Sequence, residues 1–496
     1  MTDSASIQYA NEYLLEECII WTVGGLKLDL TDLVVGVNIY EDIFQNSISG
    51  DISFVDTTNV LGNATIVGQE KLTLILATPD GSDSYDRKNA IDFSKQPFYV
   101  YKVSSSASLN EGTVAFSLGF TTAEIVRNNQ IRISKSFDGD IMIGDQATDI
   151  ITKIIRDEQD GLSSKKELFF EKTLDMHKYV IPNMRPFDAI NMLARISNSA
   201  EYDFAPSFLF YETIKGYYFR TIESMMDRKN PRMIYRETTP NQLNDKGVID
   251  IVSNLQNLLG FTVAPSTNTL VNQRTSMYAS KLLELDFYNK KWEYKNFSYT
   301  DNFPLDVHVD KHTKSGSANA PIISEVTDRF GNKLSDYPDS VLYVQSVDKL
   351  PDNPKLTPMH EKDGANPFRQ INTSEWLQRR KSRFAALDSA VTVHCEVPGN
   401  TVIQAGDLIG LEILNKSTMN SEEKYDKNLT GKYLVRKLHH VFTKDDGQFK
   451  HTIHMECIRD TMSEAYPSAG VALDDSGDNT TLLIPPGSAD PGDVKF

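Results

Sequence analysis

The chain has 496 residues, enough for about three domains, and 40% of them are hydrophobic, so it can bury sizeable cores. With 51 Lys and Arg against 68 Asp and Glu, the formal net charge is −17, which argues against binding to a nucleic-acid phosphate backbone. The 3 cysteines are widely separated and form no CxxC pair, so neither a disulfide scaffold nor a cysteine-rich zinc site is supported.

The start of the chain has neither the basic region nor the apolar stretch of a secretory signal. No apolar run approaches the roughly 18 residues that would span a bilayer. We therefore expect a soluble protein that is made in a cytosol and is not inserted in a membrane.

Residues 19–137, which follow an N-terminal segment of residues 1–18, are predicted to form a first β-barrel. Short β-rich runs such as KLTLILA and VAFSLGF are separated by Gly, Asn, Asp and Pro. In KLTLILA, Leu72, Leu74 and Leu76 share one face, which is typical of a strand with one side in a core.

The hydrophobic period changes in residues 138–235, which are predicted to form a small α+β domain. Residues 144–161 carry an apolar helical stripe of Ile150, Ile151, Ile154 and Ile155. A second helix begins with Pro186 in its first turn. A hairpin that turns at Lys215 and Gly216 follows.

A second β-barrel is predicted from residues 236–290 and 388–460, around an inserted lobe and helix of residues 291–387. In SKLLELDFYN, Leu283, Leu285 and Phe287 share one face. Within the lobe, residues 300–372 are polar and poorly periodic, which indicates a long excursion. Residues 461–496 are rich in Gly, Pro and Asp and are predicted to be a flexible tail. The predicted fold class is therefore mainly β with α+β insertions.

Four of the 9 histidines fall in one predicted hairpin, GKYLVRKLHHVFTKDDGQFKHTIHMECI. If Asp446 and Gly447 form its turn, His439 faces His454, and His440 and His451 lie on the opposite, core side. A site of two histidines and a carboxylate, from His439, His454 and Glu456, remains an alternative. The favoured interpretation is strand architecture, with no metal and no cofactor.

The usual catalytic signatures are missing from the sequence. It contains no GxxxxGK[ST] loop, no GxGxxG and no GxSxG. His360 and Glu361 hint at HExxH, but Gly364 stands where the second histidine would be. His394 and Cys395 are adjacent on a predicted strand and point to opposite faces, so they cannot act as a nucleophile and its base. We expect no enzyme and no catalytic residues.

Two features are candidate contacts with partner proteins. The first is the basic cluster QRRKSR, which is either a solvated helix face or an electrostatic contact with an acidic neighbouring subunit; its members are Arg379, Arg380, Lys381 and Arg383. The second is an apolar anchor in the acidic tail, which is either plain solvated chain or a segment that orders on a partner; its members are Leu482, Leu483 and Ile484.

Several segments, in this order, resemble baseplate hub subunits of contractile-tailed phages of the T-even type. One is SGDISFVDTTNVLGNATIVGQEKLTLIL, with its GxE turn at Gly68, Gln69 and Glu70. Others are FSLGFTTAEIVRNNQIRISKSF and PNMRPFDAINMLARISNSAEYDFAPSFLFYETIKGYYFRTIESM. The last is the strand pair before GKYLVRKLHHVF, with Val397, Gly399, Asn400, Gly406, Asp407 and Ile409. The set covers most of residues 20–460, and the chain departs from the pattern in the 300–372 excursion and the tail.

The resemblance implies a structural role. Such subunits have two tandem tube-type β-barrels and form homotrimers that adapt the sixfold tail tube to the threefold spike and continue the DNA channel. The implied partners are further copies of the chain, a spike protein, and tube or tube-initiator proteins, with the tape measure protein and baseplate wedge as further candidates. DNA would cross the lumen without specific binding. The implied location is the virion tail, after assembly in the host cytoplasm. Alternatives are a tail-associated peptidoglycan hydrolase and a hub component of a related contractile injection system.

Overall fold

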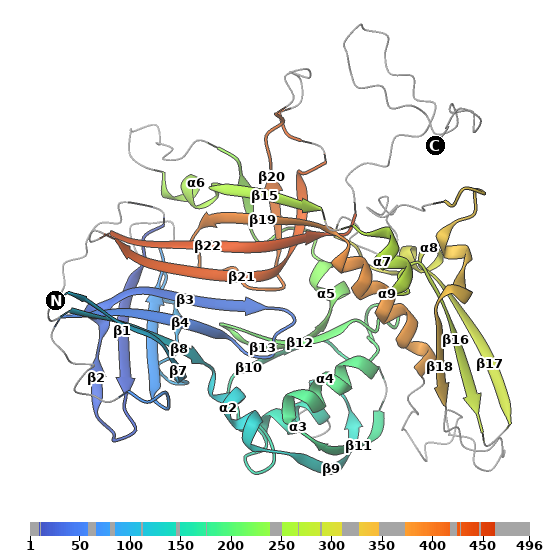
Figure 1. Ribbon diagram of the computed structural model, residues 1–496, viewed down its shortest axis with the longest axis horizontal. Helices are drawn as coiled ribbons and strands as arrows, with labels where there is room; N and C mark the ends of the chain where they lie inside the picture. Colours follow the sequence, from blue (N-terminus) through green and yellow to red (C-terminus); the bar gives the residue numbers. More distant parts are fainter. Residues whose placement is uncertain are drawn as a thin grey trace, which may run out of the picture.

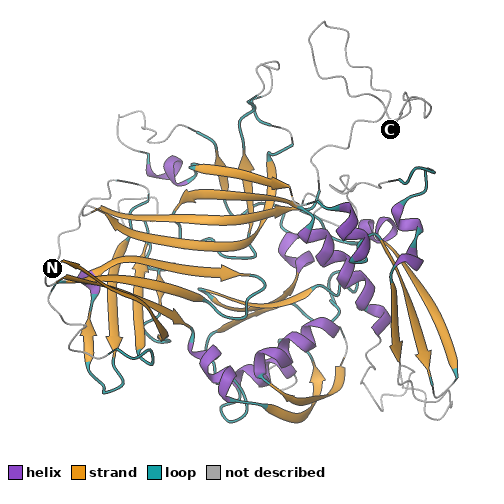
Figure 2. Cartoon of the chain, in the orientation of Figure 1, coloured by secondary structure: helices purple, strands orange, loops and turns teal. Residues whose placement is uncertain are grey.

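The computed structural model describes residues 9, 11–57, 66–79, 85–110, 113–144, 149–174, 176–238, 250–265, 267–287, 290–309, 327–346, 373–416, 424–426, 428–445 and 448–461. Strands predominate among them, which confirms the predicted, mainly β fold class. Figure 2 shows that most of the helices lie in two places, below the large sheet and between that sheet and a peripheral lobe. No helix of the described part is long and apolar enough to cross a membrane.

The largest element is a 14-stranded sheet whose main path runs β15-β19-β22-β21-β3-β4-β8-β7-β5-β1-β2. Its first half contains β1 (Leu14–Trp21), β2 (Lys27–Asp29), β3 (Val34–Asp42), β4 (Ser49–Asp56), β5 (Lys71–Ala77), β6 (Ile91–Asp92), β7 (Phe98–Asn110) and β8 (Thr113–Thr121). Its second half contains β14 (Ile234–Arg236), β15 (Gly260–Pro265), β19 (Val391–Pro398), β20 (Leu408–Glu412), β21 (Gly431–Asp445) and β22 (Gln448–Arg459).

The two halves join where β21 pairs with β3, from Lys437 opposite Asp42 to Thr443 opposite Gly36. Figure 1 shows the β21–β22 hairpin lying along β3 and β4. Because β21 has 15 residues, it reaches both hydrophobic cores. Phe442 packs in the first core and Leu438 in the second. One hairpin thus belongs to both halves.

Each half curls around its own core. The predicted apolar face of β5, Leu72, Leu74 and Leu76, is buried in the first core. In the second half an isolated bridge between Arg236 and Asn257 connects the end of β14 with the chain just before β15. All six strands of that half contribute side chains to the second core. The tube-type form of the two units stays a prediction.

A small α+β unit lies below the sheet in Figure 1. It contains α2 (Ala123–Gln130), β9 (Ile133–Asp140), α3 (Ile150–Arg156), β10 (Glu167–Phe170), β11 (Met176–Met184), α4 (Pro186–Ile196), β12 (Phe208–Thr213), β13 (Gly216–Thr221) and α5 (Ile222–Met226). The predicted isoleucine stripe of α3 is buried, α4 begins at Pro186, and Gly216 takes a φ of +146° in the predicted hairpin.

The peripheral lobe is a three-stranded sheet in the order β17-β16-β18, with short helices around it. Its elements are α7 (Thr269–Arg274), β16 (Ala279–Asp286), β17 (Lys291–Ser298), α8 (Tyr299–Asn302), β18 (Leu342–Ser346) and α9 (Leu377–Asp388), with the 3-10 turns η2 (Phe303–Leu305), η3 (Leu334–Asp336), η4 (Pro338–Ser340) and η5 (Thr373–Glu375). The other short elements are α6 (Ile251–Leu255) and η1 (Thr31–Leu33).

Three predicted boundaries need correction. β16 pairs with β17 and β18 and not with the second half of the large sheet, so the end of the 236–290 segment belongs to the lobe. Its more deeply buried face is that of Leu282, while Leu283 and Leu285 are half-buried. β1 begins at Leu14, inside the predicted N-terminal segment, because it pairs with β5. β9 pairs with β11, so the α+β unit begins before residue 138.

Buried polar groups attach the α+β unit to the sheet. Glu41 of β3 accepts hydrogen bonds from the backbone N–H groups of Ile214 and Ala405, at 2.7 and 2.8 Å. Burial raises the pKa of Glu41 to about 7. Lys166 pairs with Glu124 and Glu212, and all three side chains are almost fully buried. These contacts hold the unit against the first half of the sheet.

Candidate functional site: a polar sheet face and a buried ionic network

The histidine hairpin has the predicted register. His439 lies opposite His454, His440 opposite Ile453, and His451 opposite Phe442. His440 and His451 are fully buried, whereas His454 is exposed and His439 is half-buried. The predicted division of the four imidazoles between two faces is therefore confirmed. The turn residues Asp446 and Gly447 lie outside the described residues.

The buried histidines form a pair between the two cores. His440 Nδ1 lies 3.0 Å from His451 Nε2, and the His451 ring stacks on Phe442 with centroids 3.9 Å apart. The remaining ring nitrogens, His440 Nε2 and His451 Nδ1, are buried without a hydrogen-bond partner in the described structure. Burial lowers the pKa of His440 to about 3, and the pKa of His451 is also well below its usual value. Both rings are therefore neutral near pH 7.

The outer histidines have other partners. His439 Nε2 lies 2.9 Å from Asn38 Oδ1, and its ring stacks on Tyr40 with centroids 4.3 Å apart. Glu456 pairs with Lys437 at 3.0 Å and with Arg436 at 3.4 Å. Two members of the alternative ligand set, His439 and Glu456, are thus bound by other protein groups. No three His, Cys, Asp or Glu side chains of the described part are placed to hold a metal ion.

The face of the sheet that carries these outer histidines is polar across five strands. Two rows of paired residues cross β15, β19, β22, β21 and β3. In strand order, the first row is Thr262, His394, Glu456, Lys437 and Asp42. The second row is Gly260, Glu396, His454, His439 and Tyr40. They line an open hollow of about 940 Å³. Three carboxylates stand against one lysine in these rows, so the face is not basic.

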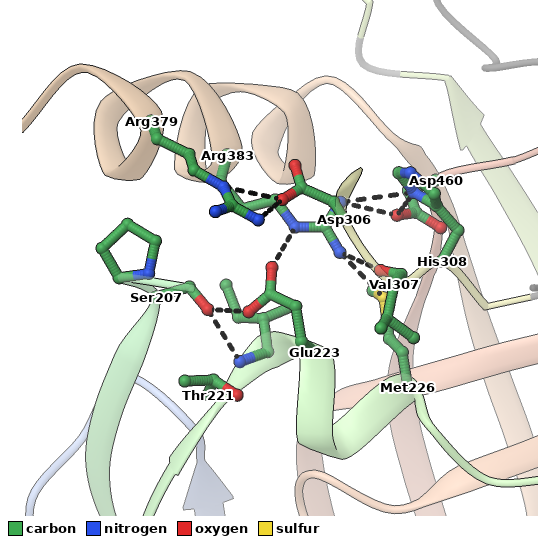
Figure 3. A network of polar contacts seen from close by, with 12 residues as sticks. Ser207, Thr221, Glu223, Met226, Asp306, Val307, His308, Arg379, Arg383 and Asp460 are labelled. Atoms are coloured by element: carbon green, nitrogen blue, oxygen red, sulfur yellow. Dashed lines mark hydrogen bonds and ion pairs between the residues drawn. The ribbon is translucent and has the colours of Figure 1, made fainter. Parts of the chain in front are cut away.

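The basic cluster lies on α9 and points largely into the protein (Figure 3). Arg383 is 4% exposed and pairs with Glu223 of α5 at 3.0 Å and with Asp460 at 2.9 Å. Arg379 pairs with Asp306 at 2.7 Å. These contacts tie α9 to the α+β unit, to the lobe and to the end of β22.

His308 completes the ionic network seen in Figure 3. Its Nδ1 lies 2.8 Å from Asp460 Oδ2, and its Nε2 lies 2.8 Å from the carbonyl oxygen of Phe303. Both partners are hydrogen-bond acceptors, so each ring nitrogen faces an oxygen atom. Burial alone would raise the pKa of Asp460, but His308 and Arg383 hold it well below its usual range. Arg379, Arg383 and His308 thus face the carboxylates of Glu223, Asp306 and Asp460.

The predicted partner contacts of the basic cluster need correction for Arg383, because a buried side chain cannot reach another subunit. Arg380 donates to the carbonyl oxygens of Pro206 and Phe208, at 2.6 and 3.0 Å. Lys381 is exposed and lies 3.9 Å from the centre of the Tyr343 ring, so it stays a candidate contact. The tail residues Leu482, Leu483 and Ile484 lie outside the described residues.

Residues of the hub-like motifs occupy turns and the junction between units. Glu70 accepts hydrogen bonds from the backbone N–H groups of Val67, Gly68 and Gln69, at 2.8 to 2.9 Å. Gly68 takes a φ of +89°, a conformation that favours glycine. Asp407 is buried and pairs with Arg228 at 2.9 Å. These motif residues fix backbone geometry.

Several residues that position these surfaces could not be predicted from the sequence, among them Glu41, Glu223, His308 and Asp460. Only Glu41 left a signal in the sequence, since it follows Val37 and Ile39 on the apolar face of β3. A carboxylate at such a position requires a specific partner. The others lie in separate segments that only the fold brings together.

Comparison with known proteins gives no family. No protein-family model matches the sequence, and no curated protein matches it. Three solved structures that resemble the fold are a tail protein from Neisseria meningitidis MC58, the 43 kDa tail protein of prophage MuSo2 from Shewanella oneidensis, and an E. coli protein described as a component of the type VI secretion system.

The degree of likeness is low in all three. The first is 9% identical with a TM-score of 0.46, over 92% of this chain and 100% of that chain. The second is 10% identical with a TM-score of 0.44, over 90% and 98% of the two chains. The third is 7% identical with a TM-score of 0.39, over 92% and 79%. TM-scores below 0.5 do not assign a function, so the function has to be inferred from the residues of this chain.

Proposed function

We propose that this chain is a structural hub subunit of a contractile phage tail. In the proposed assembly, three copies form a ring that adapts the sixfold tail tube to the threefold spike. The inner wall of that ring continues the channel through which DNA leaves the particle. The protein acts as a scaffold and carries out no reaction.

The observation that carries the proposal is the polar, non-basic face of the continuous sheet. The pairing of β3 with β21 aligns two curled units side by side in one subunit, so three subunits supply six such units. A wall that lets a polyanion pass must hold few Lys and Arg side chains, because each phosphate contact strengthens binding through counterion release. The rows that contain Asp42, Glu396 and Glu456 meet that requirement.

The ordered hub-like segments are a second support. They imply the spike protein on one side of the ring and tube or tube-initiator proteins on the other. The tape measure protein and the baseplate wedge are further proposed partners in the virion. A hub in a related contractile injection system would use the same geometry, and its particle would carry no DNA.

Native mass measurement of the purified protein, alone and mixed with the spike protein, tests the stoichiometry. We expect a trimer, at the latest when the spike is present. A density map of the assembled hub is the stricter test. A ring without threefold symmetry, or a channel lined by Lys and Arg, contradicts the proposal. Zymography on host cell walls tests the hydrolase alternative, and a cleared zone at the position of this chain favours it.

A further inference from the structure

A groove of about 860 Å³ runs between α7, α9 and β18. Its lining combines aromatic rings with positive charges, namely Tyr343, Trp376, Phe384, Arg195, Arg274, Arg380 and Lys381. Val271 on its rim is 49% exposed. The groove also has one carboxylate, Asp388, which pairs with Arg436 at 3.4 Å. The groove therefore has apolar surface and an excess of positive charge.

Arg380 lies in no ion pair with a carboxylate of the described part of the chain. Its guanidinium donates to backbone carbonyl oxygens and lies 4.6 Å from the centre of the Phe384 ring. No ion pair joins it to a carboxylate among the described residues. Burial, and then the charge of Arg195, lower the pKa of Arg380 from its usual value. The charge of a negative ligand in the groove would offset both effects.

Two hydrogen-bond donors in the groove point to the same kind of ligand. Trp376 Nε1 and Asn272 Nδ2 are buried and have no acceptor within the described structure. Buried donors in folded proteins normally have a partner. The groove thus fits a peptide that brings carboxylate or carbonyl oxygens together with apolar side chains.

The described part of the chain ends beside α9, the helix that lines one side of that groove. Asp460, one residue before the described part ends at Thr461, is bound to Arg383 of α9 at 2.9 Å. Arg383 lies one helical turn from Arg380. The 14 residues from Asp460 to Asp474 can span up to about 46 Å when extended, so residues beyond Asp474 can reach the groove.

We propose that the groove binds residues 474–486 of the same chain. Asp474, Asp475 and Asp478 complement the cations of the groove. Leu482, Leu483 and Ile484 cover its aromatic rings. This assignment is independent of the proposed role in a tail, because it concerns only contacts within one chain.

Hydrogen exchange of the full-length protein, followed by mass spectrometry, tests the assignment. In the wild-type chain, amides of residues 474–486 are expected to exchange at least about tenfold more slowly than an unstructured peptide. The variant R274E/K381E reverses two exposed cations of the groove and should bring that segment to the unstructured rate. The variant K88E/K95E makes the same change of net charge on exposed lysines of the first half and should leave the protection unchanged.

Two further measurements separate the other outcomes. In the wild-type chain, about 0.5 M NaCl should speed exchange of the segment, because it screens exposed ion pairs, and this result does not depend on how a variant folds. Dilution of the protein should leave the exchange rate of the segment unchanged. An unstructured rate in the wild type, or protection that R274E/K381E leaves intact, overturns the proposal. Protection that disappears on dilution assigns the segment to a neighbouring copy and overturns the same-chain contact.

Discussion

Single residues where the units of the molecule pack together have little freedom to change. A Cβ atom at Gly399 would lie 2.0 Å from the His451 ring, and one at Gly406 would lie 2.3 Å from the Tyr211 hydroxyl. Both glycines belong to the strand pair that resembles hub subunits. Both are buried, so packing explains why glycine stands at these two positions.

We predict that G399A lowers the free energy of unfolding by about 1–3 kcal/mol, because the added methyl group must displace the buried His451 ring. G260A is the matched control. Its Cβ would meet only Glu396 Oε2, at 3.9 Å, so it should change stability little. Urea unfolding of the two variants measures the difference, and equal midpoints would show that the junction can relax.

The neutral pair of His440 and His451 predicts an acid-sensitive core. Burial lowers the pKa values of both histidines. The stability that the neutral pair contributes is therefore fully present above the pKa of histidine in the unfolded chain, near 6.5. It is lost as the pH falls toward the folded value of about 3 for His440. The wild-type chain should therefore lose on the order of 3–5 kcal/mol from this pair on acidification.

The variant H440L/H451L removes both rings together and leaves no orphaned partner. At pH 7 its free energy of unfolding should lie within about 1 kcal/mol of the wild type. Between pH 6.5 and 3.5 it should lose less stability than the wild type. Unfolding curves at several pH values give the slope of the free energy of unfolding against pH for the wild type and for the variant. Equal slopes would contradict the assignment of acid sensitivity to this pair.

At the scale of elements, the sequence predicted well where the signal was local. A turn assumed at Asp446 and Gly447 predicts the register that β21 and β22 have, so the facing histidine pairs could be derived by counting. The stripe of α3 and the hairpin at Gly216 are local in the same way. The element β16 was misassigned because its Leu282, Leu283 and Leu285 give no clear choice of buried face.

The helix α9 was misread for a different reason. A run of Arg and Lys is ordinarily a solvated surface, and nothing near Arg383 in the sequence shows that Glu223 and Asp460 lie against it. These partners are 160 and 77 residues away. Their pairing follows from the packing of three units, which single-sequence patterns do not encode.

We predict that R383M lowers the free energy of unfolding by about 3–5 kcal/mol, because it leaves the buried carboxylates of Glu223 and Asp460 short of a cation. K381M on the same helix is the control. Lys381 is exposed, so its substitution should cost less than about 1 kcal/mol. Chemical unfolding of both variants distinguishes a buried ionic joint from a general effect of charge on α9.

At the scale of the whole molecule, the polar face predicts how the protein treats DNA. The wild-type protein should not retain double-stranded DNA. H394K/E396K adds positive charge to the rows on β19 and should create weak binding that falls steeply with added salt. Gel shift or fluorescence anisotropy at several salt concentrations measures the effect.

The control for that experiment is Q130K/E167K, which makes the same change of charge on exposed positions of the α+β unit. It should bind DNA less than the variant of the polar face, because its lysines lie outside the hollow. Equal binding by the two variants would mean that total charge, and not the position of the face, decides the interaction.

The contact between β3 and β21 also sets an order of events during synthesis. His439 and its hydrogen-bond partner Asn38 are 401 residues apart in the chain. At about 5–20 residues per second, a ribosome needs roughly 20–80 s to make that stretch. During this interval the edge of β3 has no native partner, and unpaired edges are templates for aggregation. The first half of the sheet can thus complete its edge only when the last hairpin has emerged, and nascent chains that stop before residue 431 leave that edge open to other strands.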